Sequence, residues 1–350
     1  MTYPSPSDRP RLSTRYLNAT LSRPRTEEAV ASAGELLRSG GCVAFPTETV
    51  YGLGANALEA GAVARIFAAK DRPSWDPLIV HISSAAMLHE IAEVSPRAQL
   101  LAEAFWPGPL TLLLPRTFRV PDEVTAGRRL VGVRMPAHPL ALAVIQAAGV
   151  PIAAPSANRF GRISPTTAEH VLEDLEGRID AVLDGGPTTV GVESTVLDPN
   201  AEPMMIYRPG AVTRQMIEDV AGPAEYYQGD QSQESPQALP SPGVGMRHYA
   251  PRARLLLVAD EPTLVRAAVQ LSQDGEHLGV MLPEGWTVPV AAEVFPWGDW
   301  QDTAALAQSL FRGLRSLDSR RVTTILCPVP PPEGLGAALR DRLHKAARPR

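Results

Sequence analysis

The chain has 350 residues, of which 44% are hydrophobic and 20% charged, and this composition and length are typical of a globular protein of about two domains. Its formal net charge of −5 excludes binding to nucleic acid through bulk positive charge. No apolar run approaches the ~18 residues of a membrane span, and the polar N-terminus lacks the apolar segment of a signal peptide. Cys42 and Cys327 lie too far apart in the chain for a metal-ligand spacing, so we expect a cytoplasmic protein without membrane contact.

Order is expected to begin near residue 15, after a start rich in Pro, Ser and Arg. Apolar residues at helical spacing predict helices over residues 27–38, 58–69, 98–105, 139–148, 168–175 and 213–220. Short continuous apolar runs predict buried strands over residues 42–45, 78–80, 110–114, 130–134, 152–154, 181–183, 195–197 and 204–207. This alternation predicts an α/β (α+β) fold with helices packed on a sheet.

The composition changes at residues 223–241, which are rich in Gln, Ser and Pro and show no periodicity, as expected of a linker. A smaller α/β unit follows, with strands predicted over residues 255–258, 279–282 and 323–327. Its helices are predicted over residues 263–272, 303–317 and 336–347. The sequence therefore predicts a first domain over residues 14–222, a linker or lid over 223–252 and a C-terminal domain over 253–350.

Polar clusters directly follow several predicted strands, where α/β sheets bind ligands. They are Pro46–Gly54 with Thr47 and Thr49, Lys70 with Arg72, His81, Arg134, Ser156 with Asn158, Ser194, and Arg208. Each cluster alone is explained as well by a turn, a helix cap or an ion pair. Together they supply several cations and short hydroxyl or amide side chains, without a nucleophile paired to a base, and this set suits a site that binds and orients anions.

The sequence lacks a P-loop and a zinc-binding H-E-x-x-H motif, and Gly52-Leu53-Gly54 lacks the third glycine of a dinucleotide fingerprint. Longer motifs are more informative. PTETVYGLGANA, AKDRPSWDPLIVHI, FWPGPLTLLL, VGVRMPAH, PIAAPSAN and GVESTVLD occur in this order between about residues 14 and 221. They resemble the YrdC-like threonylcarbamoyl-AMP synthase family, and SPGVGMRHYAP and GLGAALRDRLHKAA resemble its long two-domain form.

The resemblance implies a YrdC-like twisted mixed sheet with flanking helices and a smaller Rossmann-like C-terminal α/β domain. It also implies a nucleotidyltransferase that converts L-threonine, bicarbonate and ATP, with Mg²⁺, into L-threonylcarbamoyladenylate and pyrophosphate. The product feeds threonylcarbamoyl transfer to adenosine 37 of tRNAs that read ANN codons, so the tRNA threonylcarbamoyl transfer machinery is the expected downstream partner.

By resemblance, the nucleotide site contains Lys70 and Arg72, which are the expected catalytic cations, together with Ser156 and Asn158. Further ATP contacts are implied at Asp76, Leu130, Ser164, Arg208, His248 and Tyr249. Threonine-binding positions are implied at Thr49, His81, Arg134, Ala154 and Ser194, and no protein metal ligand is implied.

Two of these positions depart from the family pattern, because Asp76 stands where Asn is usual and Leu130 where a small polar residue is frequent. An aspartate near phosphates would repel them unless Mg²⁺ intervenes. The segment 241–251, with Gly243, Arg247, His248 and Tyr249, is expected to form a lid over the cleft, while a plain tether is the alternative.

Two other functions compete with this interpretation. Arg116, Arg119, Arg128 and Arg129 could form a local patch for weak RNA contact, although the acidic total and the lack of interleaved aromatic residues argue against RNA binding as the main role. A carbamoyl-transfer or hydrogenase-maturation enzyme would need additional zinc-finger segments, for which two cysteines are too few.

Overall fold

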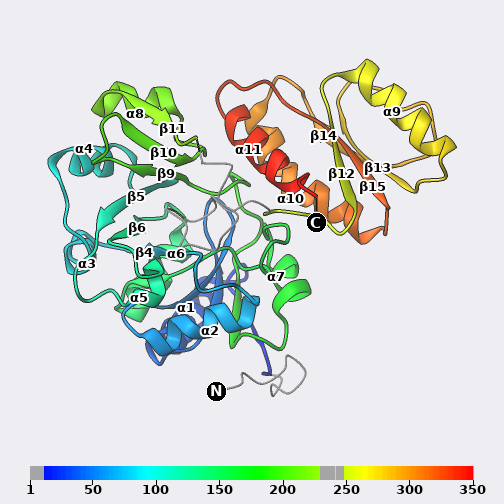
Figure 1. Ribbon diagram of the computed structural model, residues 1–350. Coiled ribbons are helices and arrows are strands. Elements are labelled where there is room, and N and C mark those ends of the chain that lie inside the picture. Colours follow the sequence, from blue (N-terminus) through cyan, green and yellow to red (C-terminus); the bar gives the residue numbers. More distant parts are fainter. Residues whose placement is uncertain (1–11, 229–240, 242–247, 350) are drawn as a thin grey trace.

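The computed structural model describes residues 12–228, 241 and 248–349, which form a large unit and a smaller C-terminal unit (Figure 1). The large unit contains a mixed 11-stranded sheet with the order β1-β8-β2-β3-β7-β4-β6-β5-β9-β10-β11. The strands are β1 (Arg15–Asn18), β2 (Val43–Pro46), β3 (Tyr51–Asn56), β4 (Ile79–His81), β5 (Leu110–Pro115), β6 (Leu130–Arg134), β7 (Ile152–Ala153), β8 (Ala181–Asp184), β9 (Thr195–Asp198), β10 (Met204–Arg208) and β11 (Ala224–Tyr226). The mixed sheet with packed helices agrees with the expected fold class.

Helices cover both faces of this sheet. They are α1 (Arg23–Arg38), α2 (Ala60–Lys70), α3 (Ala85–Ile91), α4 (Pro96–Phe105), α5 (Asp122–Thr125), α6 (Pro139–Ala148), α7 (Ala168–Leu175) and α8 (Arg214–Ala221). In β2, Val43 and Phe45 pack into one core with α1 and α6, whereas Ala44 packs into the other core with α2, α4 and α5. Because both faces are covered, β2 reads as a continuous apolar run rather than an alternating one.

The polar cluster Pro46–Gly54, which starts at the end of β2, belongs to a hairpin. Tyr51–Asn56 forms β3, which pairs antiparallel with β2, and only residues 47–50 form the turn. Gly54 lies inside the pairing, where an added Cβ would approach the Phe45 ring to 2.6 Å. Its small size therefore serves packing against the neighbouring side chains instead of close approach to a ligand.

The C-terminal unit is a parallel four-stranded sheet with the order β12-β15-β13-β14. Its elements are β12 (Arg254–Val258), α9 (Glu261–Gln273), β13 (Leu278–Pro283), β14 (Glu293–Gly298), α10 (Thr303–Ser319), β15 (Thr324–Pro328) and α11 (Gly336–Ala346). The sequence did not predict β14, which contains Pro296 and lies at the sheet edge, where proline is tolerated. Parallel strands joined by helices agree with the expected Rossmann-like unit.

The two units share a hydrophobic core. Helices α10 and α11 lie on the side of the C-terminal unit that faces the large unit, and α9 lies on the far side (Figure 1). Val50 and Val192 of the large unit belong to one apolar cluster with Leu310 and Phe311 of α10.

The predicted linker is shorter than expected at its start, because Ala224–Tyr226 forms β11 beside β10. Most of the remaining segment, including Gly243 and Arg247 of the expected lid, lies outside the described residues.

Candidate active site

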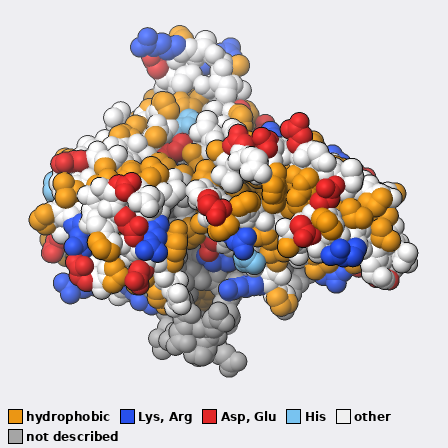
Figure 2. Space-filling view, turned by 90° about the horizontal axis from the view of Figure 1, so that it is seen from above, with side chains coloured by type: hydrophobic (Ala, Val, Ile, Leu, Met, Phe, Trp, Pro, Cys, Tyr) orange, Lys and Arg blue, Asp and Glu red, His pale blue; other side chains and the backbone are white. Residues whose placement is uncertain are grey.

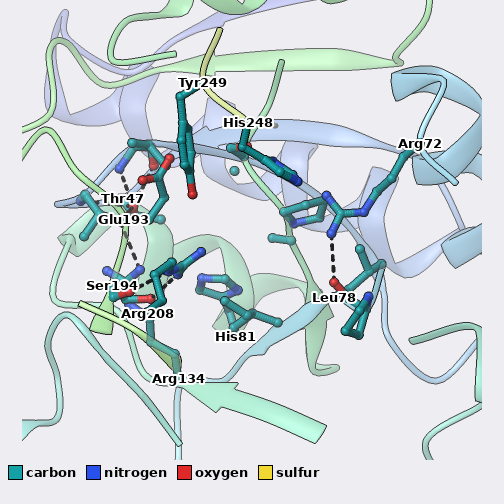
Figure 3. Close-up of a pocket in the computed structure, with 18 residues that line it drawn as sticks. Thr47, Arg72, Leu78, His81, Arg134, Glu193, Ser194, Arg208, His248 and Tyr249 are labelled. Atoms are coloured by element: carbon teal, nitrogen blue, oxygen red, sulfur yellow. Dashed lines mark hydrogen bonds between the residues drawn. The ribbon is translucent and has the colours of Figure 1, made fainter. Parts of the chain in front are cut away.

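A cavity opens at the turn between β2 and β3, where several strands of the large sheet end. The parallel neighbours β4 and β6 place His81 beside Arg134 in register, and Ser194 immediately precedes β9. Figure 3 shows side chains from these strands, from the turn and from residues 248–249 facing the same space. Those labelled are Thr47, Arg72, Leu78, His81, Arg134, Glu193, Ser194, Arg208, His248 and Tyr249, all of which line the cavity.

Arg134 is held at the end of β6 by three protein partners. Its Nε donates to the Gly108 carbonyl at 3.1 Å, Nη1 donates to Thr49 Oγ1 at 3.0 Å, and Nη2 lies 2.6 Å from Glu48 Oε1. Burial would raise the pKa of Glu48, but the Arg134 guanidinium outweighs this effect and lowers it. A guanidinium has five N–H groups, so Arg134 keeps donors for an additional anion.

His81 lies beside Arg134 as a neutral imidazole. Burial, with a smaller contribution from the Arg134 charge, lowers the pKa of His81 to about 3. Its Nδ1 is buried and has no hydrogen-bond partner among the residues that the structure describes. Since buried polar atoms are normally satisfied, this atom is available to a ligand group in the cavity.

Arg208 and Thr111 orient Ser194. Arg208 Nε donates to the Ser194 carbonyl at 2.9 Å, Arg208 Nη2 donates to Ser194 Oγ at 3.0 Å, and Thr111 Oγ1 lies 2.8 Å from the same hydroxyl. Arg208 is 5% exposed and forms no ion pair with a carboxylate among the described residues. Its positive charge is therefore available to an anion in the cavity.

Arg72 occupies the opposite side of the cavity. Its Nη2 lies 2.9 Å from Asp76 Oδ2 and donates to the Pro77 carbonyl at 2.8 Å, and the Phe160 ring lies 5.8 Å from its guanidinium carbon. Burial raises the pKa of Asp76, and the charge of Arg72 opposes this rise. Asp76 thus neutralises Arg72 in part and does not face the cavity as a free charge.

His248 and Tyr249 cover the cavity next to Arg72. His248 Nε2 lies 3.8 Å from Asp76 Oδ2, and burial together with the Arg72 charge lowers the pKa of His248 to about 3. Tyr249 adopts a left-handed backbone conformation with φ 64° and stacks on Phe311 of α10 with ring centroids 5.6 Å apart. The end of the predicted lid segment therefore contacts both the cavity and the C-terminal unit.

Lys70 and Asn158 support the cavity wall from behind. Lys70 is 1% exposed, and its Nζ donates to the carbonyls of Ser156 and Asn158. Asn158 Nδ2 donates to the carbonyls of Arg159 and Arg162. Burial lowers the pKa of Lys70 well below its usual value. These two side chains brace the loop that presents Ser156, which itself lines the cavity.

The structure brings most of the predicted site residues to this cavity. Those on its lining are Thr49, Arg72, His81, Arg134, Ala154, Ser156, Ser194, Arg208, His248 and Tyr249. Ser164 is buried and donates from Oγ to Glu193 Oε1. Leu130 lies at the opposite end of β6 from Arg134 and lines a second cavity with Arg129 and Asp198.

Thr47 and Glu193 are polar residues of the cavity lining to which the sequence assigned no ligand. Both belong to motifs that the sequence analysis recognised, and Glu193 directly precedes Ser194. Only the fold shows that their side chains line the cavity. Thr47 Oγ1 bonds to Thr49 Oγ1 at 2.8 Å and donates to the Val50 carbonyl at 2.6 Å, which shapes the turn.

Two of the four arginines suggested for RNA contact pair with acidic side chains. Arg116 pairs with Asp122, and Arg119 pairs with Glu90. On the face seen in Figure 2, basic and acidic side chains are interspersed without a continuous basic area. Over the described ranges, no helix is both long and apolar enough to cross a membrane, and no group of three or more His, Cys, Asp or Glu side chains is placed to hold a metal ion.

Comparisons with known proteins agree with this geometry. Residues 35–210 match the Sua5, YciO and YrdC family described as "Telomere recombination", and residues 212–348 match the threonylcarbamoyl-AMP synthase C-terminal domain. The chain is 43% identical to the threonylcarbamoyl-AMP synthase of Bacillus subtilis, covering 95% of this chain and 96% of that protein. It is also 43% identical to the enzyme of Pyrococcus abyssi, covering 93% and 96%.

Solved structures show the same relationship. The chain superposes on P. abyssi Sua5 complexed with L-threonine with a TM-score of 0.88 and 41% identity, covering 95% of this chain and 97% of that one. A P. abyssi Sua5 variant with a histidine and the next residue, a tyrosine, replaced by alanine also gives a TM-score of 0.88.

A two-unit α/β fold with a cationic cavity at the strand ends defines a nucleotidyltransferase of the YrdC-like type. The chain belongs to the threonylcarbamoyl-AMP synthase family, in its two-domain form. It is a transferase that makes threonylcarbamoyl-AMP.

Proposed function

We propose that the cavity binds L-threonine and ATP side by side and joins them through bicarbonate. The observation that carries this proposal is the convergence of Arg72, Arg134 and Arg208 on one cavity from three separate parts of the large unit. Threonine carboxylate, bicarbonate and triphosphate are all anions, so bringing them together requires several fixed cations. Arg72 stays predicted as a catalytic cation. Lys70, the second predicted cation, does not line the cavity and would act by holding the loop that presents Ser156.

Threonine is proposed to lie at the Arg134 side of the cavity. The remaining N–H groups of Arg134 would bind its carboxylate, next to Glu48. The neutral His81 and the oriented hydroxyls of Thr49 and Ser194 would accept hydrogen bonds from its ammonium or hydroxyl, and Ala154 would contact it through the backbone. The P. abyssi protein whose structure contains L-threonine supports this assignment.

ATP is proposed to lie between Arg72 and Arg208, under His248 and Tyr249. Arg208 lacks a carboxylate partner among the described residues, and Arg72 is only partly neutralised by Asp76, so both attract phosphate oxygens. Ser156, held through Lys70 and flanked by Asn158, presents a hydroxyl, and Ser164 contributes through the loop that it stabilises. The position of Leu130 on another cavity gives this residue no direct role in our proposal.

The proposed reaction has two steps without a covalent enzyme intermediate. The threonine ammonium first loses a proton to solvent, and the free amine attacks the carbon of bicarbonate. The nitrogen then releases a second proton, which leaves with the hydroxide as water, and a carbamate is formed. A carbamate oxygen then attacks the α-phosphorus of ATP, and the bond to the pyrophosphate oxygen breaks. Both steps bring like charges together, which the guanidinium groups offset. His248 and Tyr249 cover the cavity and exclude water from the labile carbamate and mixed anhydride.

Magnesium is proposed to enter with ATP and not to occupy a resident protein site. The carboxylates closest to the cavity, Glu48, Asp76 and Glu193, each pair with an arginine and are thus poor candidates for metal ligands. Mg²⁺ commonly binds through substrate phosphates and keeps several waters. When bound there, it would neutralise part of the triphosphate charge.

We propose that residues 14–222 form the catalytic domain, that the end of 223–252 covers it, and that residues 253–350 support this cover. In the cytoplasm, the adenylate would pass to the tRNA threonylcarbamoyl transfer machinery for position 37 of ANN-decoding tRNAs. The pairing of Arg116 and Arg119 with acids argues against direct RNA contact at that patch.

Pyrophosphate release from ATP, measured with and without L-threonine and bicarbonate, tests the proposed function. We expect release to require both, and mass spectrometry to detect threonylcarbamoyl-AMP in the same mixture. Release that is independent of threonine, with no adenylate formed, would overturn the proposal.

A further inference from the structure

Arg342 of the C-terminal unit reaches the wall of the candidate active site. It lies on α11, is 0% exposed, and its Nε donates to Glu193 Oε2 at 2.8 Å while Nη2 donates to the Glu193 carbonyl at 3.2 Å. Its Nη1 pairs with Asp341 at 2.6 Å, and its guanidinium carbon lies 5.4 Å from the centre of the Tyr249 ring. One side chain of the second unit thus contacts two residues that line the cavity.

Glu193 is the carboxylate that this arginine holds. Its Oε1 accepts a hydrogen bond from Ser164 and its Oε2 accepts from Arg342, so both oxygens are engaged. Glu193 is 6% exposed and lines the cavity beside Arg208 and Tyr249 (Figure 3). A carboxylate at this place would repel phosphates if its charge were not offset, because charge interactions are weakly screened in a buried site.

We propose that Arg342 is a positioning residue of the active site, which neutralises Glu193 and fixes it against the cavity wall so that ATP can bind. This inference rests on the proposed function, because it assumes an anionic substrate in the cavity. It also gives the C-terminal unit a specific role in catalysis. Without Arg342, a buried carboxylate would face the triphosphate without its cationic partner.

A purely structural role for Arg342 in holding the two units together is the alternative. The structure offers a matched control for it, because Arg315 of α10 forms a second link between the units, to Glu173 and Asp174 of α7. Glu173 is half exposed and does not line the cavity, so Glu173→Gln removes one of the two ion pairs of this link without changing the charge at Glu193.

The test measures pyrophosphate release in the full chain for Arg342→Met, Glu193→Gln, the double variant and Glu173→Gln. We expect Arg342→Met to raise the KM for ATP about tenfold or more, the size expected for an uncompensated buried charge. Adding Glu193→Gln should recover most of this loss, since it removes the charge that Arg342 offsets. Glu173→Gln should leave the KM within about twofold, as expected for a partly exposed pair.

Arg342→Lys keeps the proposal testable if Arg342→Met does not fold, as judged by thermal melting and gel filtration. A lysine retains the cation, so we expect a smaller rise in the KM for ATP than about tenfold, relieved further by Glu193→Gln. A wild-type KM in Arg342→Met, a double variant no better than the single one, or an equal loss in Glu173→Gln would overturn the inference. Absence of threonine-dependent release in the unmodified chain would instead contradict the proposed function.

Discussion

Glu48 Oε1 lies 2.6 Å from Arg134 Nη2, and both side chains are almost completely buried next to the cavity. Before substrate binds, an internal carboxylate therefore occupies part of the guanidinium that is expected to hold the threonine carboxylate. Three of the five N–H donors of Arg134 contact protein groups, which leaves two for a ligand. The affinity for threonine must then depend on these two remaining donors of the guanidinium.

Arg134→Lys is expected to weaken threonine binding more than ATP binding. An ammonium cannot contact Gly108, Thr49 and Glu48 in one plane and still bind a second carboxylate with two donors. We expect the KM for threonine to rise about tenfold or more, equivalent to the loss of one charge-assisted hydrogen bond. Calorimetric titration of both ligands checks this, and an equal loss for both would make Arg134 a structural residue.

Lys70→Met is expected to reduce stability as well as activity. The substitution removes the donor for the Ser156 and Asn158 carbonyls inside the core, and a buried acceptor without a donor costs about 1–3 kcal/mol. Urea unfolding measures the free energy of unfolding, and ATP titration measures binding in the folded fraction. Arg23→Met, at a position on α1 whose side chain is 91% exposed, serves as the control and should leave both unchanged.

His248→Ala is expected to raise the KM for ATP while the chain stays folded. His248 covers the Arg72 side of the cavity and does not belong to an apolar core, whereas Tyr249 is part of the core shared by the two units. Tyr249→Ala should therefore lower both activity and melting temperature, because it also removes the stacking on Phe311. Steady-state kinetics and thermal melting of both variants distinguish a residue that only covers the cavity from one that also belongs to the hydrophobic core. Wild-type kinetics in His248→Ala would contradict the proposed cover.

Buried histidines are expected to make the protein less stable as the pH falls. The pKa of His81 is about 3 in the folded chain against an ordinary value of 6.5, so between these values the unfolded chain binds a proton that the native chain does not. For this group, the free energy of unfolding is unaffected above about pH 6.5. It falls as the pH decreases from about 6.5 toward 3, by up to about 1.4 kcal/mol per pH unit. His248 contributes in the same direction.

His81→Gln is expected to reduce this dependence. Urea unfolding midpoints at about pH 5 and pH 7.5 should lie closer together in the variant than in the unmodified chain, since one proton-binding difference is removed. The comparison between the two proteins cancels the contributions of His138 and His170, whose pKa values are also lowered by burial. An unchanged difference between the midpoints would show that His81 titrates normally in the folded state.

The sequence predicted the elements that carry their own periodicity and missed those that depend on distant partners. Helix α10 and strand β6 follow from their apolar patterns, and their ends match the prediction closely. Strand β3 was missed because Gly52 and Gly54 disfavour a strand locally, whereas pairing with β2 and packing under Phe45 favour it in the fold. Strand β11 was missed because its only support is the edge of β10.

In the candidate site, too, local motifs were predictable from the sequence and contacts between distant residues were not. Motifs identified residues such as Arg134 and Ser156, but no sequence pattern shows that Lys70 points at backbone carbonyls or that Arg342 reaches Glu193, 149 residues away in the chain. These relationships are set by tertiary packing between elements that are remote in sequence. Pairing of Arg72 with Asp76 also explains why an aspartate is tolerated near the expected phosphates.

Gly191, in the loop before β9, lies against the main chain of α10. Its φ is 81°, and a Cβ added there would come within 2.4 Å of the Ala307 carbonyl oxygen and of the Gln308 α-carbon. The obstacle is helix backbone, which cannot turn aside as a side chain can. At this point the two units therefore meet main chain against main chain, with no room for a methyl group between them. Substitutions of interface side chains during evolution can change how strongly the units adhere, but this backbone contact limits how closely they can approach.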